Sequence, residues 1–74
     1  MNNLRDKKIL IDFGNHIRTI RKRKGLSMEQ LSFMADVELS QIYRIEKGKI
    51  NPTLTTLKTI ADALEISYGE LFSF

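Results

Sequence analysis

The sequence lacks the residues from which disulfides, metal centres and most catalytic sites are built. Its 74 residues include no cysteine, and His16 is the single histidine. Without cysteine, neither a disulfide nor a thiolate metal site can add stability, and one histidine cannot form a metal site alone. Acidic residues are not clustered either, so no set of groups for a catalytic site is present. We therefore expect no enzyme, no cofactor and no metal.

Long hydrophobic runs and strand patterns are also missing. No stretch of about 18 apolar residues exists, and the first residues lack the apolar core of a signal peptide. These absences predict a cytoplasmic protein without membrane contact. Alternation of apolar and polar residues never persists beyond a few positions, and the turn dipeptides of hairpins do not occur. The sequence therefore predicts one small all-α domain, with no room for a small-molecule effector domain.

The positive charge is concentrated in the first third of the chain. Residues 1–25 contain eight lysines and arginines against two aspartates, whereas the remaining residues are slightly acidic. Such a segment favours a phosphate backbone, but a solvated basic face is the commoner meaning of a charge run. The charge pattern alone does not decide between these two readings.

Stop signals and apolar spacing predict five helices joined by short connections. The expected helices are about Lys8–Lys24, a second opened by Ser27, a third from Glu38 or Leu39 to Lys47, a fourth over Leu54–Leu64, and a short fifth after Ser67. Gly25 and Gly48 act as stops, because glycine readily adopts the left-handed conformation that ends many helices. Pro52 prevents the third helix from continuing.

Three of these helices begin at a side chain that can cap the first turn. Ser27 and Ser67 are each followed three residues later by a partner, Gln30 and Glu70, which makes a capping-box pattern. Thr53 is the expected cap of the fourth helix.

Apolar residues at helical spacing predict the core. The expected positions are Ile9, Leu10, Phe13, Ile17, Ile20, Leu31, Met34, Ala35, Leu39, Ile42, Ile45, Leu54, Leu57, Ile60, Ala61, Leu64, Leu71 and Phe72. Residues 36–38 leave no room for a long loop, so the second and third helices must cross steeply, with Val37 buried at the corner. The outer face of the third helix is then free to enter the DNA major groove, which is about 12 Å wide.

Ordered motifs run through most of the chain. They are Ile17-Arg18, Arg21, Lys24-Gly25-Leu26-Ser27, Gln30-Leu31, Ala35, Val37, Ile42, Arg44-Ile45-Glu46, Gly48, Asn51-Pro52, Leu54, Leu57, Ile60-Ala61, Ala63-Leu64, Ser67 and Glu70-Leu71-Phe72. Together they resemble the lambda-repressor-like (Cro/repressor, XRE-type) helix-turn-helix family, which includes phage repressors, restriction–modification controller proteins and many antitoxins.

The resemblance implies a compact five-helix domain over residues 13–74, after an N-terminal extension of residues 1–12 that includes part of the first helix. It implies that the third helix, about residues 38–47, is the recognition helix. It also implies a structural ion pair between Arg21 and Glu46, which is reasonable because a partly buried carboxylate needs a bidentate partner.

The outward side of the third helix indicates which side chains contact bases, and the resemblance favours Leu39, Ser40 and Arg44 among them. The expected set is Glu38, Leu39, Ser40, Gln41, Tyr43 and Arg44. Arg44 is the strongest candidate, because a guanidinium can bond O6 and N7 of guanine together; the alternatives are a phosphate contact or packing over the second helix. Leu39 stands where a polar side chain is common, so it packs either on a thymine methyl or on the second helix. Glu38 suits the helix dipole and can accept from cytosine, but it repels phosphates.

Phosphate contacts are expected from the N-terminus of the second helix and from the loop after the third. The expected set is Ser27, Met28, Gln30, Lys47, Lys49 and Asn51. Met28 stands where much of the family has a polar side chain, and Gln30 is alternatively oriented toward the turn. The basic run of residues 18–24 is only partly available, because Arg21 is assigned inward and other side chains can simply be solvated.

One recognition helix reads about half a site, and two-fold dimers place two such helices about 34 Å apart on the duplex. The C-terminal segment is the expected homodimer surface, because it is more apolar than a solvent-facing tail should be. The residues concerned are Ile66, Tyr68, Leu71, Phe72 and Phe74. Alternatively, these side chains close the core of the monomer.

These features predict a sequence-specific transcriptional regulator that binds a palindromic operator in double-stranded DNA as a homodimer. Two alternatives share the fold. One is an antitoxin with a toxin as protein partner, and the other is a helical protein–protein adaptor that does not bind DNA. Steep salt dependence and preference for one palindrome would support the regulator. A stable complex with the product of a neighbouring gene would favour the antitoxin, and absence of DNA binding at low salt would leave the adaptor.

Overall fold

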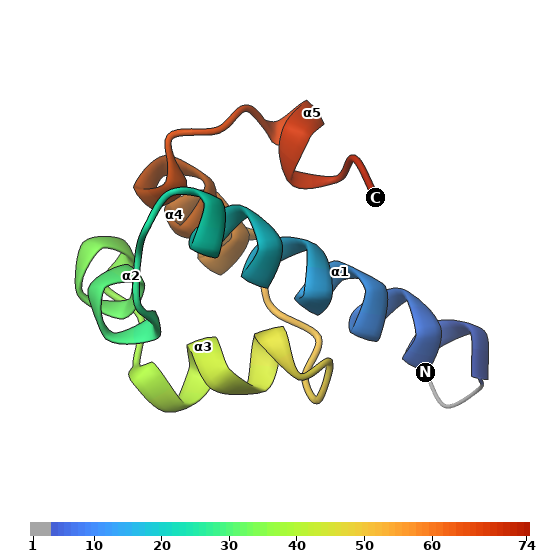
Figure 1. Ribbon diagram of the computed structural model, residues 1–74. Coiled ribbons are helices and arrows are strands. Elements are labelled where there is room, and N and C mark those ends of the chain that lie inside the picture. Colours follow the sequence, from blue (N-terminus) through green and yellow to red (C-terminus); the bar gives the residue numbers. More distant parts are fainter. Residues whose placement is uncertain (1–3) are drawn as a thin grey trace.

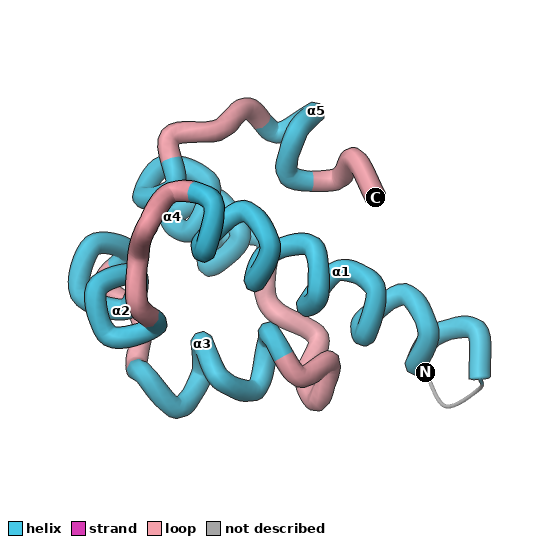
Figure 2. The backbone as a smooth tube through the Cα atoms, in the orientation of Figure 1, coloured by secondary structure: helices cyan, strands magenta, loops and turns pink. Residues whose placement is uncertain are grey.

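The computed structural model describes residues 4–74, which form five helices and no strand (Figures 1 and 2). The helices are α1 (Leu4–Arg23), α2 (Met28–Ala35), α3 (Leu39–Glu46), α4 (Leu54–Leu64) and α5 (Tyr68–Leu71). The predicted all-α fold is confirmed. The first helix begins at Leu4 rather than near Lys8, so most of the expected N-terminal extension is helical, and residues 1–3 lie outside the described part. No helix within residues 4–74 has the length and hydropathy needed to cross a membrane.

All five helices contribute to one core. Its buried apolar residues are Phe13, Ile17, Ile20, Leu31, Ala35, Ile42, Ile45, Ile60, Ala61, Leu64 and Leu71. Burying a side chain of the size of leucine or isoleucine stabilises the folded chain by about 1.5–3 kcal/mol. Val37, expected to be buried at the corner between α2 and α3, is only partly buried and packs against this core.

Five residues expected in the core are instead exposed, and Phe72 at the end of α5 is one of them. Ile9 is 56% exposed, Leu54 is 79% exposed, and Met34 and Leu39 are also largely open to solvent. The first turns of α1 extend beyond the other helices in Figure 1, and Ile9 belongs to this N-terminal part of the helix. Leu54 lies in the first turn of α4, at the edge of the packed region. Helical spacing identifies an apolar stripe but not how far a neighbouring helix covers it.

The predicted caps form, with one difference. The Ser27 hydroxyl accepts from the Gln30 amide and the Gln30 side chain accepts from the Ser27 amide, which completes a capping box. Thr53 caps α4 as expected. At α5 only half of the box forms. The Ser67 hydroxyl accepts from the Glu70 amide, while the Glu70 carboxylate accepts from Arg23 at 2.8 Å.

Two glycines allow α1 and α3 to approach closely. A Cβ at Gly14 would collide with the backbone carbonyl groups of Ile45 and Glu46 at the end of α3. Gly48, which has the predicted left-handed conformation at φ 71°, lies against the backbone of Ile11. The C-terminal end of α3 therefore packs directly against the backbone of α1.

The first helix separates two parts of the molecule. Figure 1 shows α3 on one side of α1 and α5 on the other. Contacts agree with this view. His16 lies 2.8 Å from the Glu70 carbonyl oxygen, with its Nε2 in position to donate, and Arg21 reaches Glu46 on α3. This division determines which charged residues of α1 lie beside the third helix.

Candidate nucleic-acid interface

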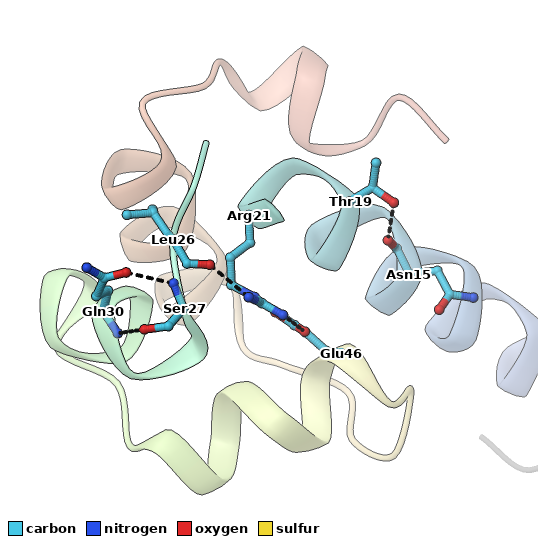
Figure 3. A network of polar contacts seen from close by, with 7 residues as sticks. All are labelled: Asn15, Thr19, Arg21, Leu26, Ser27, Gln30 and Glu46. Atoms are coloured by element: carbon cyan, nitrogen blue, oxygen red, sulfur yellow. Dashed lines mark hydrogen bonds and ion pairs between the residues drawn. The ribbon is translucent and has the colours of Figure 1, made fainter. Parts of the chain in front are cut away.

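A buried ion pair holds α3 in place. Nε and Nη2 of Arg21 donate to the two carboxylate oxygens of Glu46 at 2.7 and 3.0 Å, as predicted (Figure 3). Nη1 of Arg21 also donates to the carbonyl oxygen of Leu26 at 2.8 Å. Both charged residues are 6% exposed. The hydrogen bonding that Arg21 donates to Glu46 raises the pKa of Arg21, against the opposing effect of burial. One guanidinium thus ties together α1, the turn before α2, and the end of α3.

The inward and outward sides of α3 differ in chemistry. Ile42, Ile45 and Glu46 point into the molecule and are buried. The outward side chains are those expected to contact bases: Glu38, Leu39, Ser40, Tyr43 and Arg44 are exposed, and Gln41 is half-buried. Within residues 4–74, Arg44 forms no ion pair, so its guanidinium is available to a ligand. Glu38 is the N-cap residue but makes no capping hydrogen bond with its side chain.

Two edges flank the outward side of α3. Tyr43 and Lys47 form one edge, where the ammonium of Lys47 lies over the Tyr43 ring at 5.7 Å from its centroid. Gln41 lies on the other edge and borders a hollow shared with Thr56 of α4. A concave surface also joins α3 to the first turn of α2, lined by Ser27, Met28, Glu29, Glu38, Leu39, Ser40 and Tyr43. The structure therefore brings expected base contacts and expected phosphate contacts onto one continuous surface.

The residues expected to contact phosphates at α2 differ in which of their groups a ligand can reach. Ser27 and Gln30 are exposed but are bonded to each other in the capping box, so the Gln30 carbonyl oxygen is already occupied. Met28 packs partly against the core, which leaves its backbone rather than its side chain to face a ligand. Lys47, Lys49 and Asn51 are exposed in and after the C-terminal end of α3.

Ion pairing divides the basic residues into two groups. Lys8, Arg21, Arg23 and Lys58 pair with carboxylates. The remaining described lysines and arginines have no ion pair within residues 4–74, and they are Lys7, Arg18, Lys22, Lys24, Arg44, Lys47 and Lys49. Most of the unpaired charge therefore lies on α1 and around α3, where an anion would meet it.

The expected dimer surface needs one correction. Leu71 is 1% exposed and belongs to the core, because the single turn of α5 points it inward. Tyr68, Phe72 and Phe74 are exposed, and Ile66 is partly buried. The rings of Phe72 and Phe74 also contact Phe13, at 5.9 and 5.7 Å between centroids, so part of each closes the monomer.

Sequence reasoning missed two members of this apolar surface. Leu54 borders a hollow with Tyr68 and Phe72, and Ile9 borders a neighbouring hollow with Phe72 and Phe74. Both fit the apolar stripes of their helices, so the sequence pattern predicts them in the core. Their position near helix ends was the available signal that they extend past their packing partners.

Comparisons with known proteins match the same region. A family model described as helix-turn-helix covers residues 17–71. The chain is 42% identical over 67 residues to the control protein C.MunI of a Mycoplasma species, covering 88% of this chain and 89% of that protein. It is 40% identical over 58 residues to the immunity repressor protein of Bacillus phage phi105, but covers only 40% of that longer protein.

Solved structures show the same architecture. The restriction–modification controller protein C.AhdI from Aeromonas hydrophila superposes with a TM-score of 0.83 at 38% identity, covering 85% of this chain and 96% of that one. The residues matched by the family model, 17–71, include α2, α3 and the buried Arg21–Glu46 pair. These relatives are transcriptional regulators and controllers, not enzymes. The chain therefore belongs to the XRE-type helix-turn-helix family of DNA-binding transcriptional regulators.

Proposed function

We propose that this protein is a sequence-specific transcriptional regulator of the controller type, with α3 lying in the DNA major groove. The proposal rests on one observation. The buried side chains of Ile42, Ile45 and Glu46 fix the inner side of α3, while its outward side presents unpaired polar groups. A rigid helix with free donors on one face suits direct readout of base edges. The similarity to C.MunI and C.AhdI over most of their lengths supports the controller assignment, and a role on DNA puts the protein in the cytoplasm.

Base contacts are assigned to the outward side of α3. Arg44 donates to O6 and N7 of guanine, which is the commonest specific contact of an arginine. Ser40 and Gln41 offer shorter polar groups beside it, and Leu39 packs on a thymine methyl. Glu38 and Tyr43 lie at the periphery of this set, where Glu38 disfavours nearby phosphates and so raises selectivity at a cost in affinity.

Phosphate contacts are assigned to both ends of the surface. The first turn of α2 offers backbone N–H groups near Ser27 and Met28, with the Gln30 amide beside them. Lys47, Lys49 and Asn51 contact phosphates beyond the C-terminal end of α3. These contacts position the domain without reading sequence.

We also propose a homodimer on a palindromic operator. The surface formed by Ile9, Leu54, Tyr68, Phe72 and Phe74 is apolar and contains two hollows, and burial of such a surface favours association. Partly buried Ile66 lies at its margin. A two-fold dimer presents two copies of α3 to successive turns of the major groove.

Selection from a random pool of DNA duplexes tests this function. We expect enrichment of one palindrome whose half-sites are about one helical turn apart, roughly 10 base pairs between centres. Enrichment of a single asymmetric half-site would contradict the dimer, and no enrichment at low salt would contradict the regulator.

A further inference from the structure

A groove next to the surface assigned above runs between α1 and α3 and shares Met28, Tyr43 and Lys47 with it. Its lining residues are Ile11, Asn15, Arg18, Arg21, Met28, Tyr43, Glu46 and Lys47. Tyr43 and Lys47 form one wall, and Asn15 and Arg18 form the other. The buried Arg21–Glu46 pair lies between them.

The groove carries net positive charge, because its carboxylate is already paired and cannot neutralise the other cations. Glu46 is the carboxylate that lines it, and both of its oxygens are occupied by Arg21. Arg18 has no ion pair within residues 4–74, and Lys47 is held over the Tyr43 ring rather than by a carboxylate. An anion entering the groove would therefore meet two unneutralised cations.

The register of α1 explains why Arg18 remains unpaired. Asn15, Arg18 and Lys22 are spaced so that they share one flank of the helix, and Asn15 and Arg18 line the groove beside α3. The opposite flank faces α5, where Arg23 pairs with Glu70 and His16 meets the Glu70 carbonyl oxygen. The acid that α5 brings to this helix, Glu70, is thus used on the side away from α3.

We propose that this groove extends the phosphate contacts of Lys47 onto α1, with Arg18 as a further charged contact to the DNA backbone and Asn15 as a further donor. The proposal rests on the proposed function, because it assumes that α3 occupies the major groove. A helix in that groove has a phosphate backbone along each edge. Since α1 packs against α3 beside the Tyr43–Lys47 edge, its Arg18 flank faces the backbone on that edge.

The expected effect is on salt dependence and not on sequence preference. Each lost phosphate contact lowers the slope of log affinity against log salt by about 0.9, or about 1.8 for two subunits of a homodimer. The loss in affinity on raising salt from about 50 to 200 mM should accordingly be about 3.5-fold smaller for each contact removed. The ratio of operator to non-specific affinity should stay the same, because the contact carries no base information.

Arg18→Gln and Arg23→Gln form a matched pair for the experiment. Each removes one positive charge from an exposed position on α1, but Arg23 lies on the α5 side. Fluorescence anisotropy with a mixed-sequence duplex and with the selected operator gives the slope for each variant. We expect a lower slope for Arg18→Gln on both DNAs, a parental slope for Arg23→Gln, and recovery of the slope in Arg18→Lys.

The outcomes separate the two proposals. A parent protein without salt-dependent DNA binding would contradict the proposed function itself. If the parent binds DNA and Arg18→Gln keeps the parental slope, the proposed phosphate site is wrong, but the proposed function as a regulator still stands. An equal decrease in Arg23→Gln would also overturn the site, because it would show an effect of net charge alone. Thermal unfolding of each variant verifies that these exposed substitutions leave the fold intact.

Discussion

The guanidinium of Arg21 donates hydrogen bonds to both carboxylate oxygens of Glu46, at 2.7 and 3.0 Å, and both side chains are shielded from water. The pair links α1 to the last turn of α3, next to the point where Gly14 meets the same turn. The C-terminal end of α3 is therefore held by a charge pair and a backbone contact together.

Removing the carboxylate should strongly destabilise the protein. Glu46→Ala leaves the Arg21 guanidinium buried without its counter-charge, which costs about 3–5 kcal/mol in comparable pairs. Urea unfolding gives the difference through the midpoint and slope. Arg23→Ala is the control, because it removes an exposed pair that contributes less than about 1 kcal/mol. Equal losses in the two variants would show that the buried pair is not a major anchor.

A methyl group at Gly14 should also destabilise the fold. Gly14→Ala forces the carbonyl groups of Ile45 and Glu46 away from α1, and overpacking of this kind costs about 1–3 kcal/mol. Gly69→Ala is the matched control, since the nearest atom to a Cβ there is the Ser67 hydroxyl at 3.7 Å. Chemical denaturation should place Gly14→Ala well below the parent and Gly69→Ala at or above it. A Gly14→Ala variant as stable as the parent would refute the close approach.

Loss of the Arg44 side chain should weaken operator binding selectively. Arg44→Ala removes a bidentate contact worth about 1–3 kcal/mol for each half-site, and preference at the guanine that it reads should relax. Lys49→Ala should instead weaken binding equally on all sequences, because a phosphate contact does not discriminate bases. Titrations against operators with single base-pair changes test both. If Arg44→Ala retains full preference at every position, Arg44 does not read a base.

A charge in the apolar surface should separate the subunits. Leu54→Asp places a carboxylate beside the hollow that Leu54 forms with Tyr68 and Phe72, where dimerisation would have to bury it. The monomer should tolerate the change, because Leu54 is 79% exposed. Phe33→Asp is the control, since Phe33 on α2 is even more exposed at 87% and lies outside this surface. Sedimentation should show a monomer for Leu54→Asp and a dimer for the parent and Phe33→Asp.

A monomeric parent at tens of micromolar would contradict the homodimer. Dissociation of both variants to the same extent would place the interface elsewhere or spread it over both faces. Either result leaves the assignment of α3 to the major groove open to the Arg44 experiment.

Local chemistry in the sequence was enough to predict most of the fold. Ser27 with Gln30, Thr53 and Gly48 act through bonds or torsions within a few residues, so their roles did not depend on distant segments. The apolar spacing of Ile42 and Ile45 likewise determined which side of α3 faces the interior. The Arg21–Glu46 pair came from the family resemblance, because no local rule joins residues so far apart in the chain.

Only the tertiary structure decided which apolar and charged groups remain available. Ile9, Leu54 and Leu71 all fit apolar patterns, yet Ile9 and Leu54 are exposed and Leu71 is buried. Burial depends on whether another helix covers a residue, and periodicity within one helix does not contain that information. The same holds for charge. Glu70 neutralises Arg23 and not Arg18 because α5 packs on one flank of α1 and α3 on the other, so folding leaves the unpaired cations beside α3.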